Sequence, residues 1–129
     1  MGWRIEFYQE ADGKEPVKDF LMELNIPSRQ KIFSYLDLLE ERGLLPYPYS
    51  RKIEGIKKLR ELRVEFASNI YRIFYFVHKD KQIILLHGFI KKSQKIPSKE
   101  IAVAQRRLKD FLARDKKEGG VRDGQGKRF

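Results

Sequence analysis

Four side chains that can handle a phosphate or a proton recur between residues 63 and 91: Arg63, Arg72, His87 and Lys91. The planar fork of arginine donates two hydrogen bonds to phosphate oxygens, and histidine is the usual proton carrier near neutral pH. A lysine crowded by other cations loses its proton more easily. RNA carries its own nucleophile, the 2′-hydroxyl, so that a base, an acid and cations for the phosphorane are enough for cleavage without a metal. These residue types alone indicate an RNA-binding domain or a ribonuclease.

The alternation of the surrounding residues predicts that these four side chains share one face of an antiparallel meander. Three strands are predicted, at about 58–66, 70–78 and 82–91, with turn residues at 67–69 and 78–81 between them. A short first turn sets Arg63 directly across from Arg72, and the second turn sets Arg72 across from His87, with Lys91 further along the same face. We therefore expect Arg63, Arg72, His87 and Lys91 to be the catalytic residues.

Other interpretations of these residues stay open at this point. Two arginines directly across a strand pair repel each other unless an anion lies between them, and Glu61 or Glu65 on the same face could neutralise them instead. His87 could equally be a core residue whose hydrogen bonds are satisfied. The opposite face is predicted to seat two N-terminal helices on Leu62, Val64, Phe66, Tyr71, Ile73, Tyr75, Ile84, Leu86 and Ile90. On the arginine face, Phe74, Phe76, Ile83 and Leu85 are expected to lie beneath the last helix.

The positive charge is concentrated around this meander. Residues 1–50 hold six basic and nine acidic side chains, whereas residues 51–95 hold twelve basic and four acidic ones. Such asymmetry favours a polyanionic partner. Polar and cationic residues that flank the meander can follow the phosphates of a single strand. The predicted RNA-binding residues are Lys52, Lys57, Lys58, Arg60, Lys92, Gln94 and Lys95.

Length and composition set the remaining bounds. The 129 residues fit one domain, with a net charge of +10. Cysteine is absent and the two histidines stand apart from any carboxylate motif, so we expect no metal and no cofactor. No apolar run suits a membrane span or a signal peptide, which predicts a cytoplasmic protein without a membrane partner. Residues 1–116 form the predicted domain, and the glycine-rich, basic residues 117–129 a flexible tail.

The order of the elements follows from the same periodicities. A short strand is predicted at 3–8, and two amphipathic helices follow, the first beginning near Pro16 and the second ending at Gly43. An extended connector with two prolines at 45–49 leads into the meander. Pro97 opens a last amphipathic helix. The fold class is α+β: a strand and a helical hairpin packed on a three-strand meander, followed by a C-terminal helix.

Three short motifs occur in this order along the chain. They are LRELRV at 59–64, IYRIFY at 70–75 and LHGFIKKSQKIP at 86–97, followed by Glu100 and Ile101. This string resembles the HigB/RelE-type toxins of bacterial toxin–antitoxin systems, in their phage-derived branch within the RelE/ParE superfamily. The likeness covers roughly residues 3–113. Arg63 and Arg72 match arginines of the family, and Lys91, Lys92 and Lys95 match its basic positions.

The resemblance implies a RelE-like fold and a function. It implies a type II toxin that cleaves mRNA in the A site of the small ribosomal subunit, with contacts to ribosomal RNA and without a metal. Its second partner would be a cognate antitoxin, of the kind that often carries a helix-turn-helix domain. Some relatives use a tyrosine or histidine near the C-terminus as a proton carrier, and no such residue follows Lys95 here. The acid and base roles therefore fall to lysines or to His87. Two rival functions remain, a ParE-like toxin that binds gyrase and an RNA-binding module without catalysis.

Overall fold

The core of the protein is a mixed β-sheet. The computed structural model describes residues 2–91 and 95–122, with their side chains as far as residue 116. Its strands are β1 (Arg4–Phe7), β2 (Ser50–Lys52), β3 (Arg60–Phe66), β4 (Asn69–His78) and β5 (Gln82–Ile90). They lie in the order β1-β5-β4-β3-β2. The strands β3, β4 and β5 form the predicted antiparallel meander, while β2 extends it at one edge and β1 pairs parallel with β5 at the other.

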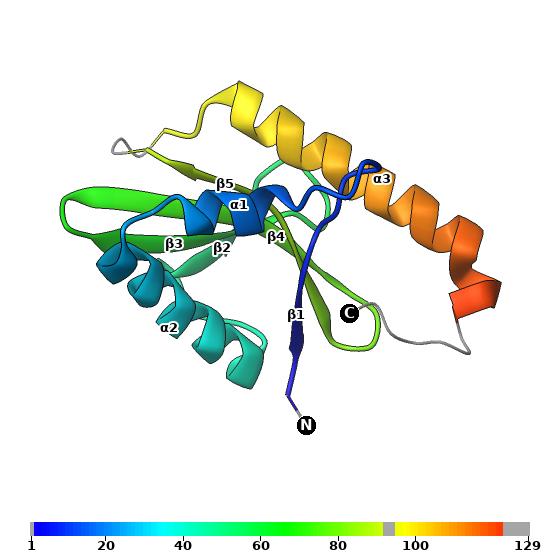
Figure 1. Cartoon of the computed structure of the whole chain (residues 1–129), viewed down its shortest axis with the longest axis horizontal. Coiled ribbons are helices and arrows are strands. Elements are labelled where there is room, and N and C mark those ends of the chain that lie inside the picture. The colour runs from blue at the N-terminus through cyan, green and yellow to red at the C-terminus, as the bar shows by residue number, and fades with distance from the viewer. Residues whose placement is uncertain (1, 92–94, 123–129) are drawn as a thin grey trace.

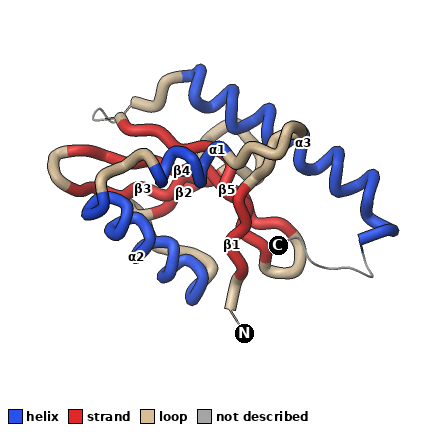
Figure 2. The backbone as a smooth tube through the Cα atoms, viewed as in Figure 1, coloured by secondary structure: helices blue, strands red, loops and turns tan. Residues whose placement is uncertain are grey.

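Helices cover both faces of this sheet. The helices α1 (Pro16–Met22) and α2 (Ile26–Arg42) lie on one side and the long α3 (Ser98–Arg122) on the other, as Figure 1 shows. Figure 2 separates the red strands from the blue helices and makes the layers easier to follow. Gly43 ends α2 with a φ of 77°, and a Cβ there would lie 2.1 Å from the Trp3 indole, so only glycine fits. The predicted helical hairpin and C-terminal helix are both confirmed.

Each layer of helices encloses its own apolar core. The core beneath α1 and α2 contains Val17, Leu21, Ile32, Leu36, Leu39, Leu45, Leu62, Val64, Tyr71, Ile73, Tyr75, Ile83 and Leu85. The core beneath α3 contains Tyr8, Ile53, Leu59, Phe74, Phe76, Ile84, Leu86, Phe89, Ala104 and Leu108. The prediction that the two N-terminal helices cover the face opposite the arginines, and the last helix the arginine face, is therefore confirmed.

The register of the meander agrees with the prediction between β3 and β4 and differs from it between β4 and β5. Arg63 pairs with Arg72 as predicted. Arg72, however, pairs with Phe89, and His87 pairs with Phe74, so the prediction that Arg72 lies across from His87 is wrong by two residues. All five side chains still lie on the α3-facing side of the sheet, because a shift of two preserves the face.

A β-bulge changes the face of four further residues. The register between β4 and β5 slips by one between Phe74 and Tyr75, which leaves Leu86 as the extra residue. Toward the β4–β5 turn, Ile84 and Leu86 consequently pack in the α3 core, and Ile83 and Leu85 in the α1–α2 core. The sequence analysis assigned these four residues to the opposite faces, because strict alternation has no place for an inserted residue.

Polar contacts along its length fix α3 to the rest of the fold. Tyr8 donates its hydroxyl to Asp110 Oδ2 at 2.5 Å, and burial together with Asp110 raises the pKa of Tyr8 to about 12. Further on, Arg114 Nη2 donates to the Gln9 carbonyl at 2.5 Å. The helix continues to Arg122, so that it includes the first residues of the predicted tail, and residues 123–129 lie outside the described part of the chain. None of the described helices is both long enough and apolar enough to span a bilayer.

Candidate functional site

Three rows of side chains cross the sheet on its α3-facing side. The first row contains Arg51, Glu61, Phe74 and His87, on β2, β3, β4 and β5. The second contains Arg63, Arg72 and Phe89. The third contains Glu65, Ile70 and Lys91, since Lys91 N donates to the Ile70 carbonyl just beyond β5. We call Arg51, Glu61, Arg63, Arg72 and Lys91 the basic cluster.

Glu61 is the buried centre of the basic cluster. Its side chain is 0% exposed, and its two carboxylate oxygens accept from two different arginines, Arg51 Nε at 2.7 Å and Arg72 Nη1 at 2.5 Å. Arg72 is only 1% exposed, whereas Arg51 is 40% exposed. A buried carboxylate requires such charged partners, because its desolvation is otherwise very costly. Arg72 therefore lies inside the protein, and the neutralisation by Glu61 that the sequence left open is what the structure contains.

Arg63 has a different environment from Arg72. Its side chain is 14% exposed, and Nη2 lies 2.7 Å from Glu65 Oε2, on a side chain that is 65% exposed. An ion pair with such an exposed partner contributes little stability and exchanges easily. Arg63 Nε is buried and has no hydrogen-bond partner among the residues that the structure describes. Of the two predicted arginines, Arg63 is the one that a ligand can reach.

His87 is held at both ring nitrogens. Nε2 lies 2.6 Å from Glu100 Oε1, and Nδ1 lies 3.4 Å from Arg107 Nη1. Since a guanidinium only donates, Nδ1 accepts and Nε2–H donates to Glu100. Burial lowers the pKa of His87 from its ordinary 6.5, and Glu100 opposes part of this effect. The predicted proton carrier thus joins β5 to the first turns of α3, which agrees with the interpretation of a satisfied histidine.

Lys91 lies at the open end of the basic cluster, beyond the last residue of β5. Its side chain is partly exposed, and it forms no ion pair with any residue that the structure describes. Lys95 is exposed as well, while Lys92 and Gln94 lie outside the described residues. Lys91 and Arg63 are therefore two cations that a ligand can reach, and they lie on adjoining rows of one face of the sheet.

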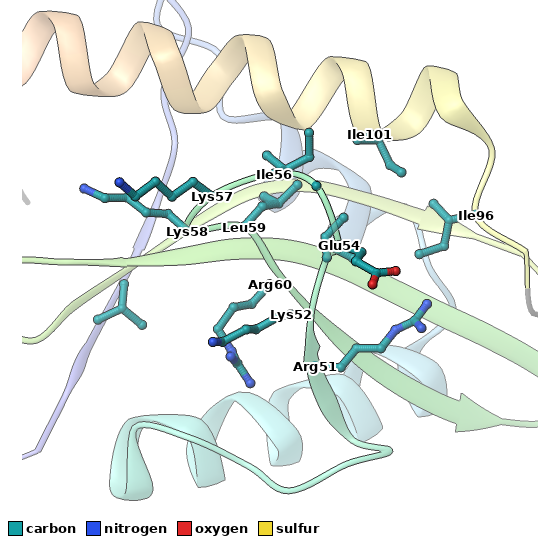
Figure 3. A pocket seen from close by; sticks show the side chains of 13 residues that line it. Arg51, Lys52, Glu54, Ile56, Lys57, Lys58, Leu59, Arg60, Ile96 and Ile101 are labelled. Atoms are coloured by element: carbon teal, nitrogen blue, oxygen red, sulfur yellow. The ribbon is translucent and has the colours of Figure 1, made fainter.

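The predicted RNA-binding residues near β2 do not all belong to this face. Lys52 pairs with Arg60 across β2 and β3, one position along from the Arg51–Glu61 pair, and so faces the α1–α2 side. Arg60 is tied there by hydrogen bonds to the Tyr75 hydroxyl and Ser50 Oγ, both at 3.3 Å. Figure 3 shows Lys52 and Arg60 pointing away from the side chain of Arg51. The structure therefore does not bring Lys52 and Arg60 together with the basic cluster.

An open groove of about 1040 Å³ surrounds the loop between β2 and β3. Lys57 and Lys58 lie exposed on this loop, with Lys58 at a positive φ of 74°. The groove is lined by Arg51, Lys52, Ile53, Glu54, Gly55, Ile56, Lys57, Lys58, Leu59, Arg60, Val77, Ile96 and Ile101. In Figure 3 its Ile96 and Ile101 wall lies on the same side as Arg51. This part of the groove continues the basic cluster toward the start of α3.

Sequence reasoning missed two features of this site. Arg51 was not among the predicted site residues, although the basic excess of the chain begins at that residue. Its three-residue strand β2 is too short to show a periodic pattern. The partners of His87, Glu100 and Arg107, come from α3, and no short-range signal connects them to a strand histidine. Within residues 2–91 and 95–122, no three histidine or carboxylate side chains gather closely enough to bind a metal ion.

Comparison with known proteins places this geometry in a family. The model described as "Phage derived protein Gp49-like (DUF891)" matches residues 19–109. Among solved structures, the chain is similar to one from the crystal structure of the archaeal RelE–RelB complex from Pyrococcus horikoshii OT3, at 25% sequence identity and a TM-score of 0.52. That match covers 74% of this chain and 100% of the other. No curated protein matches the chain. The predicted RelE-like α+β fold is confirmed, and the chain belongs to the phage-derived Gp49-like family.

Proposed function

We propose that this protein is the toxin of a type II toxin–antitoxin system, of the HigB type, and that it cleaves mRNA on the ribosome. The observation that carries the proposal is the placement of Arg63 and Lys91 on one sheet face. Arg63 has only an exposed ion-pair partner, and Lys91 has none among the described residues. Membership in the Gp49-like family and the RelE-like fold support the same conclusion. The substrate would be mRNA in the A site of the small subunit, in the cytoplasm where ribosomes translate.

The reaction would use the 2′-hydroxyl of the RNA as nucleophile. As this oxygen gives up its proton and attacks the neighbouring phosphorus, a dianionic phosphorane forms, and the 5′-oxygen must take up a proton when its bond to phosphorus breaks. Arg63 would exchange Glu65 for the phosphorane oxygens, which its planar fork can bind bidentately. Lys91, on the adjoining row, would give a proton of its ammonium group to the leaving 5′-oxygen, and the proton of the 2′-hydroxyl would pass to a water molecule. His87 would act by holding α3 in place, because both of its nitrogens already have partners.

The protein partner would be an antitoxin. The structure to which this chain is similar is described as a RelE–RelB complex. We propose that the present protein likewise forms a complex with a partner, an antitoxin with a helix-turn-helix domain, which neutralises it by binding it before it reaches a ribosome. The high density of cations on the meander makes an acidic inhibitory segment the natural complement.

The decisive experiment is incubation of the purified protein with ribosomes that are translating a defined mRNA, followed by mapping of new 5′ ends. We expect cleavage within the codon in the A site, and no cleavage of the same mRNA without ribosomes. Arg63→Ala and Lys91→Ala should each remove most of the new ends. Intact mRNA, together with inhibition of DNA supercoiling by gyrase, would identify a gyrase-binding toxin instead. RNA binding without new ends would identify a module that lacks catalysis.

A further inference from the structure

We propose that Arg51 is a phosphate-binding residue of this site and that Glu61 and Arg72 are positioning residues that hold it. The inference rests on the proposed function in that RNA is taken as the ligand. It assigns a role to a residue that no sequence motif identifies. It also changes the role of Arg72, from a group that touches the substrate to one that acts through Glu61.

The hydrogen bonds of Arg51 leave its outer edge available. Arg51 Nε donates to Glu61 Oε1 at 2.7 Å, which fixes the near side of the guanidinium. The two Nη atoms, with four N–H donors, form no hydrogen bond to any described residue. An end-on pair of Nη donors is a geometry with which arginine binds a phosphate bidentately. Arg51 is therefore anchored at one nitrogen and open at the other two.

The charge balance of the group favours an anion at this position. Arg72 and Glu61 neutralise each other in the interior, with side chains that are 1% and 0% exposed. Arg51 then carries an uncompensated positive charge where the side chain reaches the surface, at 40% exposure. Because Glu61 is shielded from water, salt weakens its ion pair with Arg51 less than it weakens a pair between two surface residues. A pre-oriented cation costs a ligand less ordering than a free side chain.

Arg51 is also well placed relative to Arg63. Both flank Glu61 on the α3-facing side, Arg51 across the β2–β3 ladder and Arg63 two residues along β3. Diagonal neighbours of this kind lie roughly 7–8 Å apart in a sheet, a distance that neighbouring phosphates of one RNA strand can bridge. Beyond Arg51, Ile96 and Ile101 form an apolar wall of the groove, and the Glu54 carboxylate lies between this wall and the Arg51 side chain (Figure 3). The RNA would pass from Arg63 to Arg51 and then along this wall.

The test compares Arg51→Gln and Arg51→Lys with a control that removes the same charge elsewhere. Arg42→Gln is suitable, because Arg42 is exposed at the last turn of α2 and is not part of the basic cluster. Binding of a short single-stranded RNA, whose 2′-oxygens are all methylated so that they cannot attack the phosphates, is measured as a function of salt. Arg51→Gln should flatten the slope of log affinity against log salt by about 0.7, the value for one phosphate contact on a single strand, and Arg51→Lys should restore it. Arg42→Gln should leave the slope unchanged.

Single-turnover cleavage on ribosomes provides the second measurement. Arg51→Gln should slow cleavage about tenfold or more, and Arg51→Lys should recover only part of the rate, since lysine cannot bind end-on through two nitrogens. In the protein that retains Arg51, Glu61→Gln should raise the KM for the cleavage on ribosomes. In the Arg51→Gln variant, the additional Glu61→Gln change should not weaken RNA binding further. If Glu61→Gln does not fold, the two Arg51 variants, which alter a partly exposed side chain, still decide the question.

The outcomes separate this inference from the proposed function. Unchanged salt slope and cleavage in Arg51→Gln, equal to those of Arg42→Gln, would overturn the inference and leave the ribonuclease in place. A wild-type protein that never cleaves, yet binds the blocked RNA with a slope that depends on Arg51, would overturn the proposed function and support the role of Arg51.

Discussion

Arg63 and Arg72 are direct cross-strand partners in β3 and β4, yet their guanidinium groups bind different glutamates. Arg72 reaches Glu61 in the interior, and Arg63 reaches Glu65 at the surface. The repulsion between two adjacent cations is thus relieved by carboxylates on β3, one on each side of Arg63. Two residues that look equivalent in the sequence should therefore respond differently to mutation.

Arg72→Ala should destabilise the fold far more than Arg63→Ala. Loss of Arg72 leaves Glu61 buried with Arg51 as its remaining partner, and we expect a cost of about 3 kcal/mol, the lower end for a broken buried pair. Loss of Arg63 removes a pair with an exposed partner, at a cost of about 1 kcal/mol or less. Urea denaturation of both variants measures the difference. Equal midpoints for the two variants would show that the buried contact of Arg72 with Glu61 contributes no more stability than the surface contact of Arg63 with Glu65.

Arg63→Ala should slow ribosome-dependent cleavage by about 10²–10³-fold, the usual loss for one preoriented donor to a transition state. Arg63→Lys should recover part of this rate. Single-turnover cleavage at saturating protein isolates the chemical step. Asp37→Asn, on the exposed side of α2, is the control for charge change and should cleave as the wild type does. A normal rate for Arg63→Ala, per folded molecule, would make Arg63 a structural residue.

The lowered pKa of His87 should make the folded protein less stable in mild acid than at neutral pH. The pKa of His87 in the folded state lies below the ordinary 6.5. Between these two pKa values, the unfolded chain binds a proton that the folded chain does not bind. Stability from this group is complete above pH 6.5 and is lost as the pH falls through the folded pKa. The groups that face the ring are Glu100 and Arg107. Melting temperatures of wild type and His87→Gln between pH 7 and 5 test this: the drop on acidification should be smaller in the variant.

Affinity for RNA should depend strongly on salt, and unequally on the cations of the two sheet faces. Between about 50 and 200 mM salt, we expect affinity to fall by about 10²–10⁴-fold if roughly five to eight phosphates are contacted. Lys91→Gln should flatten this dependence more than Lys52→Gln, because Lys52 lies on the α1–α2 side. Titrations of both variants at several salt concentrations provide the comparison. Equal slopes would show that the bound RNA contacts both faces.

Most of the fold could be predicted because its elements carry strong local patterns. The meander, the two amphipathic helices and the glycine at the end of α2 are all visible in residue spacing. The bulge at Leu86 was not, because Gly88, the nearby residue that could have signalled it, was interpreted as part of a regularly alternating strand. A single inserted residue then reversed the faces of Ile83 and Ile84.

The candidate site was only partly predictable, because the alternation of residues along a strand predicts on which face of the sheet a side chain lies but not how far it is buried. It placed Arg63 and Arg72 on one face correctly. Whether each side chain is covered depends on the path of α3 and on which carboxylate it meets, and both are long-range features. The buried position of Arg72 and the contacts of His87 with Glu100 and Arg107 could therefore be found only in the folded structure.

The polar contacts that fix α3 have a consequence for the order in which a ribosome makes this protein. Strand β1 pairs with β5, with Arg4 opposite Gln82, and Tyr8 binds Asp110, a partner 102 positions later in the chain. A nascent chain that has emerged only as far as β4 therefore has an unpaired first strand and an uncovered Arg72. Contacts of such sequence separation form late, because a long loop must close before they are made. All residues of the basic cluster precede α3, so they are synthesised before the helix that covers their face of the sheet, and they reach their final surroundings only when α3 has packed against that face.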